Sequence, residues 1–198
     1  MTLRVNATHA RAERGLDPYW TPPEATRALL QIERLPQNNW EPACGNGAIA
    51  KVLRSAGRAV LSSDIARYDG FEPDFVADYL TAPVPHGVQA VVTNPPFKLA
   101  IEFVAKAIID APYVALLLRL NFLESVRRLP FFRKTPPARI WVSSRRLPMM
   151  QRLGWDGRQA PSNHCFAWFV WERGAAAAEI KWFDWGNSDD SNGPGDFE

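Results

Sequence analysis

Apolar and polar residues along the chain form two kinds of stretch that follow each other in turn. The first kind is short, apolar or β-branched and ends at turn-forming residues, which favours strands over Asn39–Ala43, Arg58–Ser63, Asp74–Ala77, Val88–Thr93 and Tyr113–Leu118. The second kind has apolar residues at helical spacing, which favours helices over Ala48–Ala56, Leu99–Asp110 and Asn121–Leu129. Strands that alternate with helices predict an α/β domain with a parallel sheet and right-handed crossovers.

Both ends of this alternating region carry further signals. A helix is predicted to begin near Pro22, because Thr21 can act as its N-cap and Glu24 stands at the third helical position. Three more strands are predicted towards the C-terminus, over Arg139–Ser143, Cys165–Trp171 and Ile180–Trp185. We expect the last two to pair as an antiparallel hairpin through Gly174 and the alanine run that follows it.

The length of 198 residues fits one domain, and 46% hydrophobic residues are enough for a buried core. We expect an N-terminal arm over 1–18, one domain over 19–185, and a disordered tail over 186–198, which has four acidic residues and no basic ones.

The start lacks the apolar segment of a signal peptide, and no apolar run approaches the roughly 18 residues that span a bilayer. Cys44 and Cys165 are too few for a disulfide framework. We therefore expect a cytoplasmic protein without a membrane partner.

Positive charge is concentrated in one segment, although the formal net charge of the chain is only +2. Between Arg119 and Arg158, ten basic residues are opposed by two acidic ones, a net charge of +8. This excess favours a polyanionic partner, most naturally a nucleic acid. A solvated face that keeps the protein soluble is the alternative. We name residues 119–162 the basic segment, and its candidate contacts are Arg119, Arg127, Arg128, Arg145 and Arg146.

A glycine-containing turn follows the first predicted strand and precedes a helix; its sequence is Glu41-Pro42-Ala43-Cys44-Gly45-Asn46-Gly47. Gly45 and Gly47 let the backbone turn tightly and approach a ligand, and the helix after them presents its first N–H groups. The turn lacks the third glycine of the dinucleotide fingerprint and the Gly-Lys-Ser/Thr of a phosphate loop. By itself, such a turn does not identify the ligand.

Two aspartates stand at the ends of the next two predicted strands. Asp64, which lies 17 positions after Gly47, can accept hydrogen bonds from both ribose hydroxyls of a nucleoside cofactor. Asp78 can accept from an adenine amino group. Either residue could instead serve as a turn or capping aspartate. Because the carboxyl ends of parallel strands meet at one edge of a sheet, we expect both aspartates beside the glycine turn.

The most specific motif is Asn94-Pro95-Pro96-Phe97, directly after a predicted buried strand. Two prolines fix the backbone and remove two N–H donors, and the side-chain oxygen of Asn94 adds an acceptor to the neighbouring carbonyls. Phe97 offers a flat apolar face for a planar ring. Acceptors that hold the hydrogens of an aromatic NH2 group raise the electron density on its nitrogen, which suits methyl transfer by positioning and electrostatics, without a metal or a strong base. The alternative is that the prolines merely end the strand.

These motifs, in this order and spacing, resemble the class I methyltransferases that modify amino groups of adenine in DNA. The resemblance covers residues 19–118, with a looser likeness to small prophage-type enzymes beyond them. It implies a Rossmann-like class I fold with a mostly parallel seven-stranded sheet, helices on both faces, and S-adenosyl-L-methionine as cofactor. The implied catalytic residues are Asn94, Pro95, Pro96 and Phe97. The implied cofactor-binding residues are Tyr19, Thr21, Glu41, Ala43, Gly45, Gly47, Asp64, Ile65, Asp78 and Asn94.

The chain departs from typical restriction-associated enzymes of this kind in one respect. Only 46 residues separate Gly47 from Asn94, which leaves no room there for a target-recognition domain. If the protein recognises DNA, the basic segment must contact it. The leading prediction is methylation of adenine N6 in DNA, with the base flipped out or single-stranded. The alternatives are cytosine N4, a base amine in RNA, a glutamine amide in a protein, and a non-catalytic nucleic-acid-binding subunit.

Overall fold

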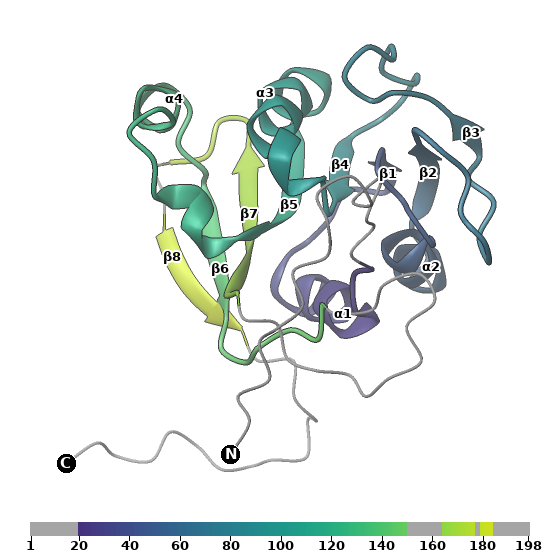
Figure 1. Cartoon of the computed structure of the whole chain (residues 1–198), viewed down its shortest axis with the longest axis horizontal. Helices are drawn as coiled ribbons and strands as arrows, with labels where there is room; N and C mark the ends of the chain where they lie inside the picture. Colours follow the sequence, from purple (N-terminus) through teal and green to yellow (C-terminus); the bar gives the residue numbers. More distant parts are fainter. Residues whose placement is uncertain (1–19, 150–163, 177–178, 184–198) are drawn as a thin grey trace, which may run out of the picture.

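The computed structural model describes residues 20–149, 164–176 and 179–183, which form one sheet with helices packed against it (Figure 1). The strands are β1 (Asn38–Glu41), β2 (Ala59–Asp64), β3 (Phe75–Val76), β4 (Ala90–Thr93), β5 (Tyr113–Arg119), β6 (Arg139–Ser143), β7 (Phe166–Glu172) and β8 (Glu179–Phe183). The helices are α1 (Pro23–Ile32), α2 (Ala48–Ser55), α3 (Ala100–Asp110) and α4 (Leu129–Lys134), with short 3-10 helices η1 (Phe97–Leu99) and η2 (Leu120–Leu123). The predicted α/β alternation is confirmed.

The sheet is mostly parallel, as predicted, but it has eight strands rather than seven, in the order β3-β2-β1-β4-β5-β7-β6-β8. β7 runs antiparallel to β5 and β6, whereas β8 pairs in parallel with β6. Because β6 lies between β7 and β8, the predicted hairpin of these two strands is wrong. Burial accounts for the order: Phe166–Trp171 of β7 are all buried, which requires an interior position, whereas Ile180 of β8 is 55% exposed at the sheet edge.

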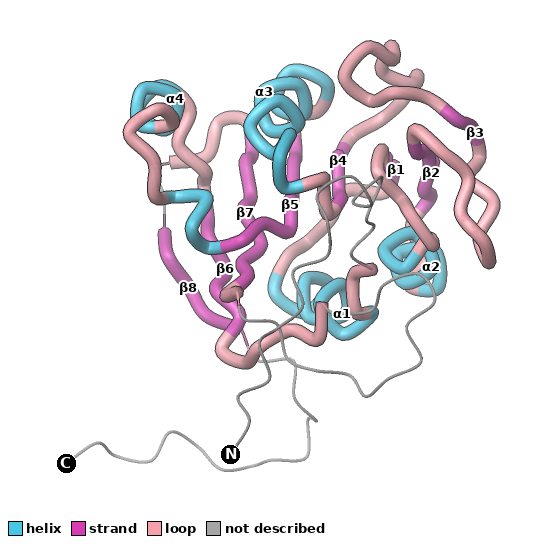
Figure 2. The backbone as a smooth tube through the Cα atoms, viewed as in Figure 1, coloured by secondary structure: helices cyan, strands magenta, loops and turns pink. Residues whose placement is uncertain are grey.

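Helices cover both faces of the sheet, as predicted (Figure 2). On one face, α1 and α2 bury Leu29 and Leu53 in the same apolar cluster as Leu117 of β5. On the other face, Phe103 of α3 is buried with Leu116 of β5, and the phenylalanines of α4 pack against that cluster. Successive residues of β5 point to opposite faces, so six consecutive positions of this strand are buried. None of the described helices is long and apolar enough to cross a membrane.

A buried polar network fastens the end of α1 to the sheet. The Glu33 carboxylate accepts hydrogen bonds from Arg139 Nε at 2.6 Å, Trp141 Nε1 at 2.6 Å and the Tyr113 hydroxyl at 2.7 Å. Burial alone would raise the pKa of Glu33, but the hydrogen bonds and the charge of Arg139 outweigh it and lower the pKa. Arg139 also donates to Glu172 at 2.7 Å. Part of the positive charge counted in the basic segment is therefore neutralised inside the fold.

The helix predicted over Asn121–Leu129 is wrong. The chain forms η2, a turn and then α4, with Pro130 in the first turn of that helix. Arg128 donates three hydrogen bonds, of 2.7 to 3.1 Å, to backbone carbonyl oxygens of the preceding residues. These bonds hold the segment in a non-helical path, because they occupy carbonyls that a continuous helix would use for its own hydrogen bonds.

Candidate active site

A cavity of about 490 Å³ opens at the carboxyl ends of the parallel strands, within the range of roughly 300–1,000 Å³ found for small-molecule sites. Twelve residues predicted from the sequence contribute to its lining: Thr21, Glu41, Ala43, Gly45, Asp64, Ile65, Asp78, Asn94, Pro95, Pro96, Phe97 and Arg119. Gly47 is not part of the lining, and Tyr19 lies outside the described residues. The glycine turn and the Asn94–Phe97 loop therefore open into one space.

The turn between β1 and α2 requires glycine at two positions. Gly45 and Gly47 have φ values of +52° and +72°, in the left-handed region that residues with a Cβ rarely adopt. Space is also short, because a Cβ on Gly45 would lie 2.6 Å from the Trp20 ring and one on Gly47 would lie 2.4 Å from the Phe71 ring. The missing side chain at Gly45 thus leaves room for the Trp20 ring in the cavity lining, and the missing side chain at Gly47 leaves room for the Phe71 ring.

Asp64, the last residue of β2, is held in place by the backbone. Its Oδ2 accepts a hydrogen bond from the Gly45 N–H and its Oδ1 accepts one from the Ile65 N–H, both at 2.8 Å. Burial raises the pKa of Asp64, and the backbone hydrogen bonds oppose that rise. Each carboxylate oxygen has two acceptor sites, so Asp64 can also accept hydrogen bonds from a ligand in the cavity.

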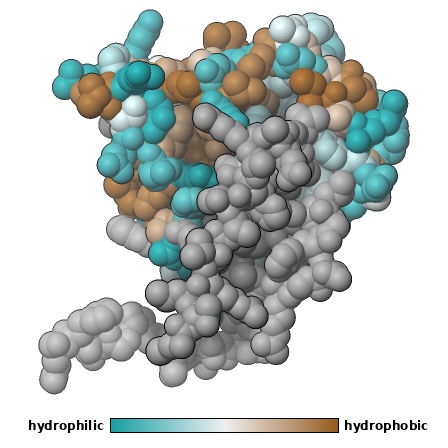
Figure 3. Space-filling view, viewed as in Figure 1, coloured by the Kyte–Doolittle hydropathy of each residue, from teal (hydrophilic) through white to brown (hydrophobic). Residues whose placement is uncertain are grey.

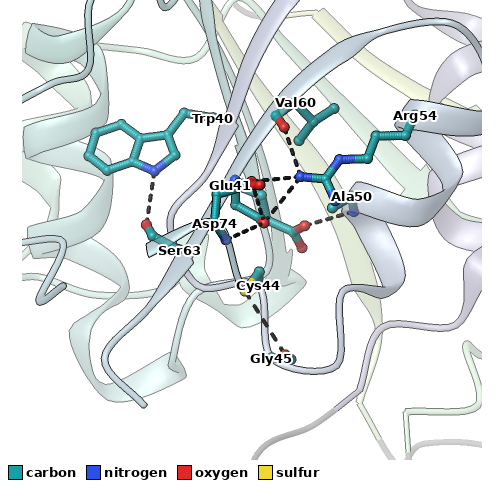
Figure 4. Close-up of polar contacts among 10 residues, drawn as sticks. Trp40, Glu41, Cys44, Gly45, Ala50, Arg54, Val60, Ser63 and Asp74 are labelled. Carbon is teal, nitrogen blue, oxygen red and sulfur yellow. Dashed lines mark hydrogen bonds and ion pairs between the residues drawn. The ribbon is translucent and has the colours of Figure 1, made fainter. Parts of the chain in front are cut away.

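Glu41, the last residue of β1, is almost fully buried at the base of the glycine turn. Its Oε2 accepts a hydrogen bond from the Ala50 N–H of α2 at 2.7 Å (Figure 4). Burial raises the pKa of Glu41 well above its ordinary value; the hydrogen bond opposes the rise and the charge of Asp64 adds to it. Burial, with Glu41 and Asp64 nearby, also raises the pKa of the Cys44 thiol. Cys44 is therefore protonated at neutral pH and unsuited to act as a nucleophile.

The Asn94–Phe97 loop leaves β4 and continues directly into η1 and α3. Asn94 Nδ2 donates a hydrogen bond to Thr21 Oγ1 at 3.1 Å. Thr21 was predicted to cap α1, and this prediction is wrong, because the N-cap is Pro22 and no side chain caps the helix. The hydroxyl instead contacts Asn94. This contact fixes the orientation of the Asn94 amide, because its nitrogen faces Thr21 and its carbonyl oxygen therefore points away from Thr21.

Asp78, which was predicted to bind an adenine amino group, is an exposed residue of the cavity lining. Its Oδ1 accepts a hydrogen bond from the Leu80 N–H at 3.0 Å, so it also has the turn role considered as the alternative. The ring of the next residue, Tyr79, packs against the Phe103 ring with centroids 4.8 Å apart, and both residues line the cavity. The lining around Asp78 thus combines an exposed carboxylate with buried aromatic rings.

The five arginines predicted to contact a nucleic acid differ in their surroundings. Arg119 lines the cavity. Arg128 is occupied by its backbone hydrogen bonds, which makes it part of the fold. Arg127, Arg145 and Arg146 are exposed, and part of the basic segment lies outside the described residues. Figure 3 shows hydrophilic and hydrophobic residues intermixed on the described surface.

Several aromatic residues of the lining were not predicted as site residues. Trp20 and Tyr68 meet edge to face, with ring centroids 5.5 Å apart, on the side of the glycine turn. Trp20 stands between Tyr19 and Thr21, which were both predicted to bind the cofactor, and this position was the available signal. Tyr68 lies in the loop after β2, where no motif or periodicity marks it. Within the described ranges, no group of three or more His, Cys, Asp or Glu side chains is placed to hold a metal ion.

Comparisons with known proteins bear on the fold. No family model matches the chain, and neither does any curated protein sequence. Solved structures do match. A proposed RNA methyltransferase from Pyrococcus horikoshii is 15% identical, with a TM-score of 0.59 over 78% of this chain and 87% of that one. A proposed class I S-adenosylmethionine-dependent methyltransferase from Listeria monocytogenes is 12% identical, with a TM-score of 0.55 over 86% and 67%.

A third match is the modification subunit of a proposed type I restriction enzyme from Vibrio vulnificus YJ016, 14% identical, with a TM-score of 0.57 over 87% of this chain. The chain spans about half of that subunit, 48% of its length. These matches show that the chain has the fold of the class I methyltransferases; in this chain β8 lies at the edge of the sheet beside β6.

Proposed function

We propose that this protein is an S-adenosylmethionine-dependent methyltransferase that modifies an amino nitrogen. One observation carries the proposal: the glycine turn with Asp64 and the acceptor-rich Asn94–Phe97 loop line the same cavity. A cofactor held by the turn and an amine held by the loop would share this space. The fold supports the proposal, since one of the solved structures with this fold is described as a class I S-adenosylmethionine-dependent methyltransferase.

The residues of the cavity suit this cofactor, which combines a nucleoside with a cationic amino-acid chain and supplies a methyl group on positively charged sulfur. Asp64 is the candidate acceptor for the ribose hydroxyls, and Asp78 for the adenine amino group. Ile65, which is 55% exposed in the lining, offers an apolar surface to the adenine ring. Glu41 and the backbone at Gly45 are the candidates for the methionine part.

The Asn94–Phe97 loop is assigned to the target amine. The oxygen of Asn94 and the carbonyl of Pro95 accept the hydrogens of the NH2 group, which raises the electron density on its nitrogen. Phe97 supplies the ring on which a base stacks, a contact worth about 1–3 kcal/mol per base. Since the loop starts at a buried strand and Thr21 restrains Asn94, these groups are held before the substrate arrives.

The substrate we propose is adenine in DNA, methylated at N6. The Asn-Pro-Pro-Phe loop favours a planar aromatic amine, and the exposed Arg127, Arg145 and Arg146 favour a polyanion. RNA is the second candidate, because one solved structure with this fold is described as a proposed RNA methyltransferase. A duplex base must leave its stack to reach the cavity, so the proposal requires base flipping or a single-stranded substrate.

Calorimetric titration of the cofactor tests the first step of this proposal. The wild-type protein should bind S-adenosylmethionine in the micromolar range, roughly −8 kcal/mol. Asp64→Ala should weaken binding by about 10- to 100-fold, because hydrogen bonds to a charged acceptor contribute about 1.5–3 kcal/mol. Asp69→Ala, an exposed aspartate outside the lining, is the matched control and should bind like the wild type. Equal affinity in the Asp64→Ala and Asp69→Ala variants would contradict the assignment of Asp64.

A further inference from the structure

Phe97 lies between two neighbours. On one side its ring meets the Phe166 ring, with centroids 5.8 Å apart and planes inclined by 46°. The guanidinium carbon of Arg119 lies over the Phe97 ring, 4.0 Å from its centroid. A guanidinium is planar and prefers to stack on aromatic faces. The surface of Phe97 that the proposed function assigns to the target base is therefore covered by an arginine in this structure.

The backbone of Arg119 is firmly positioned. Arg119 is the last residue of β5 and stands opposite Phe166 in the ladder between β5 and β7. Beyond it, the Leu120 N–H donates to the Cys165 carbonyl at 2.9 Å, which continues the pairing of the two segments. A displacement of the guanidinium from Phe97 therefore requires rotation of the side chain, which an arginine can make about its own torsions without any change in the strand.

Arg119 and a second arginine of the basic segment act on the same histidine. The pKa of His164 is lowered, first by partial burial and then by the positive charges of Arg119 and Arg146. Because Arg119 itself lines the cavity and lies over Phe97, a cationic group stands at the position assigned to the target base. A phosphate next to the target base would meet this guanidinium, and an arginine fork suits its oxygens.

We propose that Arg119 is the residue that couples entry of the target base to binding of its phosphate. The guanidinium occupies the base position on Phe97 before the substrate arrives, and it turns to the backbone phosphate of the target nucleotide when the base stacks there. This inference rests on the proposed function and deepens it. It names a substrate that must bring both a planar base and a phosphate, so a nucleotide within a strand is preferred over an isolated base.

Three substitutions of Arg119 separate its stack from its charge. Arg119→Gln keeps a planar amide and removes the charge, Arg119→Lys keeps the charge and removes the planar fork, and Arg119→Ala removes both. Arg27→Ala is the matched control, because Arg27 is an exposed arginine of α1 outside the cavity lining. All proteins are saturated with S-adenosylhomocysteine, so that a nucleoside probe does not report on the cofactor part of the cavity.

The first measurement is the salt dependence of binding to a single-stranded deoxyadenosine oligonucleotide. Loss of one phosphate contact should lower the log–log slope by about 0.7 in Arg119→Gln and Arg119→Ala, and leave it unchanged in Arg119→Lys and Arg27→Ala. The second measurement is quenching of 2-aminopurine deoxynucleoside, whose fluorescence falls on stacking. The affinity of this nucleoside should rise severalfold in Arg119→Ala and Arg119→Lys, because no planar guanidinium then competes with the base for the Phe97 ring. It should stay near wild type in Arg119→Gln.

The inference is overturned if Arg119→Ala keeps the wild-type slope, or if it binds the nucleoside more weakly than the wild type does. The second outcome would mean that Arg119 and Phe97 bind the base between them, whereas the proposal requires the guanidinium to leave the Phe97 ring. Adding Phe97→Ala to Arg119→Ala should abolish the gain in nucleoside affinity, and a gain that persists would also overturn the inference. Failure of the wild-type protein to bind any oligonucleotide, with cofactor binding intact, would overturn the proposed nucleic-acid substrate and the inference together.

Discussion

Replacing Glu33 by glutamine should destabilise the protein far more than a surface change of the same kind. The Glu33 side chain is 6% exposed and the Arg139 side chain is 20% exposed. Glutamine would remove the charge and turn an NH2 group towards donors that now point at a carboxylate, among them Trp141 and Tyr113. Breaking a buried pair from one side costs about 3–5 kcal/mol. Arg139 keeps Glu172 and some solvent, so we expect about 2–4 kcal/mol.

Urea unfolding followed by tryptophan fluorescence measures this loss, and thermal unfolding should show a fall in Tm of about 5–15 °C, given about 2–4 °C per kcal/mol for this chain length. Glu24→Gln is the matched control. Glu24 pairs with Arg27 at 3.3 Å on the surface, with its side chain 41% exposed, so its loss should cost less than about 0.5 kcal/mol. A loss below about 0.5 kcal/mol in Glu33→Gln would refute the reasoning.

The same variant has a predicted pH dependence. The pKa of Glu33 is lowered below its ordinary value of 4.5, because the hydrogen bonds and charge around it outweigh its burial. A carboxylate with a lowered folded-state pKa contributes stability above its unfolded pKa and loses that contribution as the pH falls through its folded pKa. The stability difference between wild type and Glu33→Gln should therefore be constant above about pH 4.5 and shrink in more acidic solution. A difference that grows with acid would contradict this sign.

Two further predictions follow from the glycine turn and the cysteines. Gly47→Ala should lower stability by more than the roughly 1–2 kcal/mol that a left-handed backbone conformation costs, because the new Cβ would meet Phe71 at 2.4 Å. Gly70→Ala, with φ +85° and nothing within 4 Å of the new Cβ, should cost only this backbone part. Equal losses of stability in thermal unfolding would contradict this prediction. Iodoacetamide at pH 8 should modify the exposed Cys165 and spare Cys44, because Cys44 is buried and its thiol pKa is raised. Peptide mass spectrometry measures the two modifications, and equal labelling of both cysteines would contradict the burial argument.

Much of the site was predictable because its residues stand at strand ends that local chemistry marks. Pro95 and Pro96 stop a buried strand, and glycines mark the turn after β1, so the carboxyl edge of the parallel strands could be located residue by residue. The structure accordingly brings Gly45, Asp64 and Asn94 to one cavity. The order of the last three strands was not predictable in this way, since pairing between distant segments depends on which strand needs two buried faces.

The positive charge of the basic segment was harder to interpret from the sequence than the positions of the cavity residues. Arg128 and Arg139 add to the positive charge of the basic segment, yet one binds backbone carbonyls and the other binds Glu33, which lies 106 positions away in the chain. A count of charges along a segment does not reveal such partners, because they come from other elements. Trp20 and Tyr68 were missed as site residues for a related reason, since loop residues that close over a cavity follow no periodic pattern.

The central claim is most directly tested by identifying the atom that becomes methylated. The protein is incubated with labelled S-adenosylmethionine and DNA, RNA or protein substrates, and the products are digested and separated by mass. The account predicts label in N6-methyldeoxyadenosine, and a loss of turnover of about 100-fold or more in Asn94→Ala with cofactor affinity nearly unchanged. Label confined to a protein glutamine, or near-native turnover in Asn94→Ala, would contradict it.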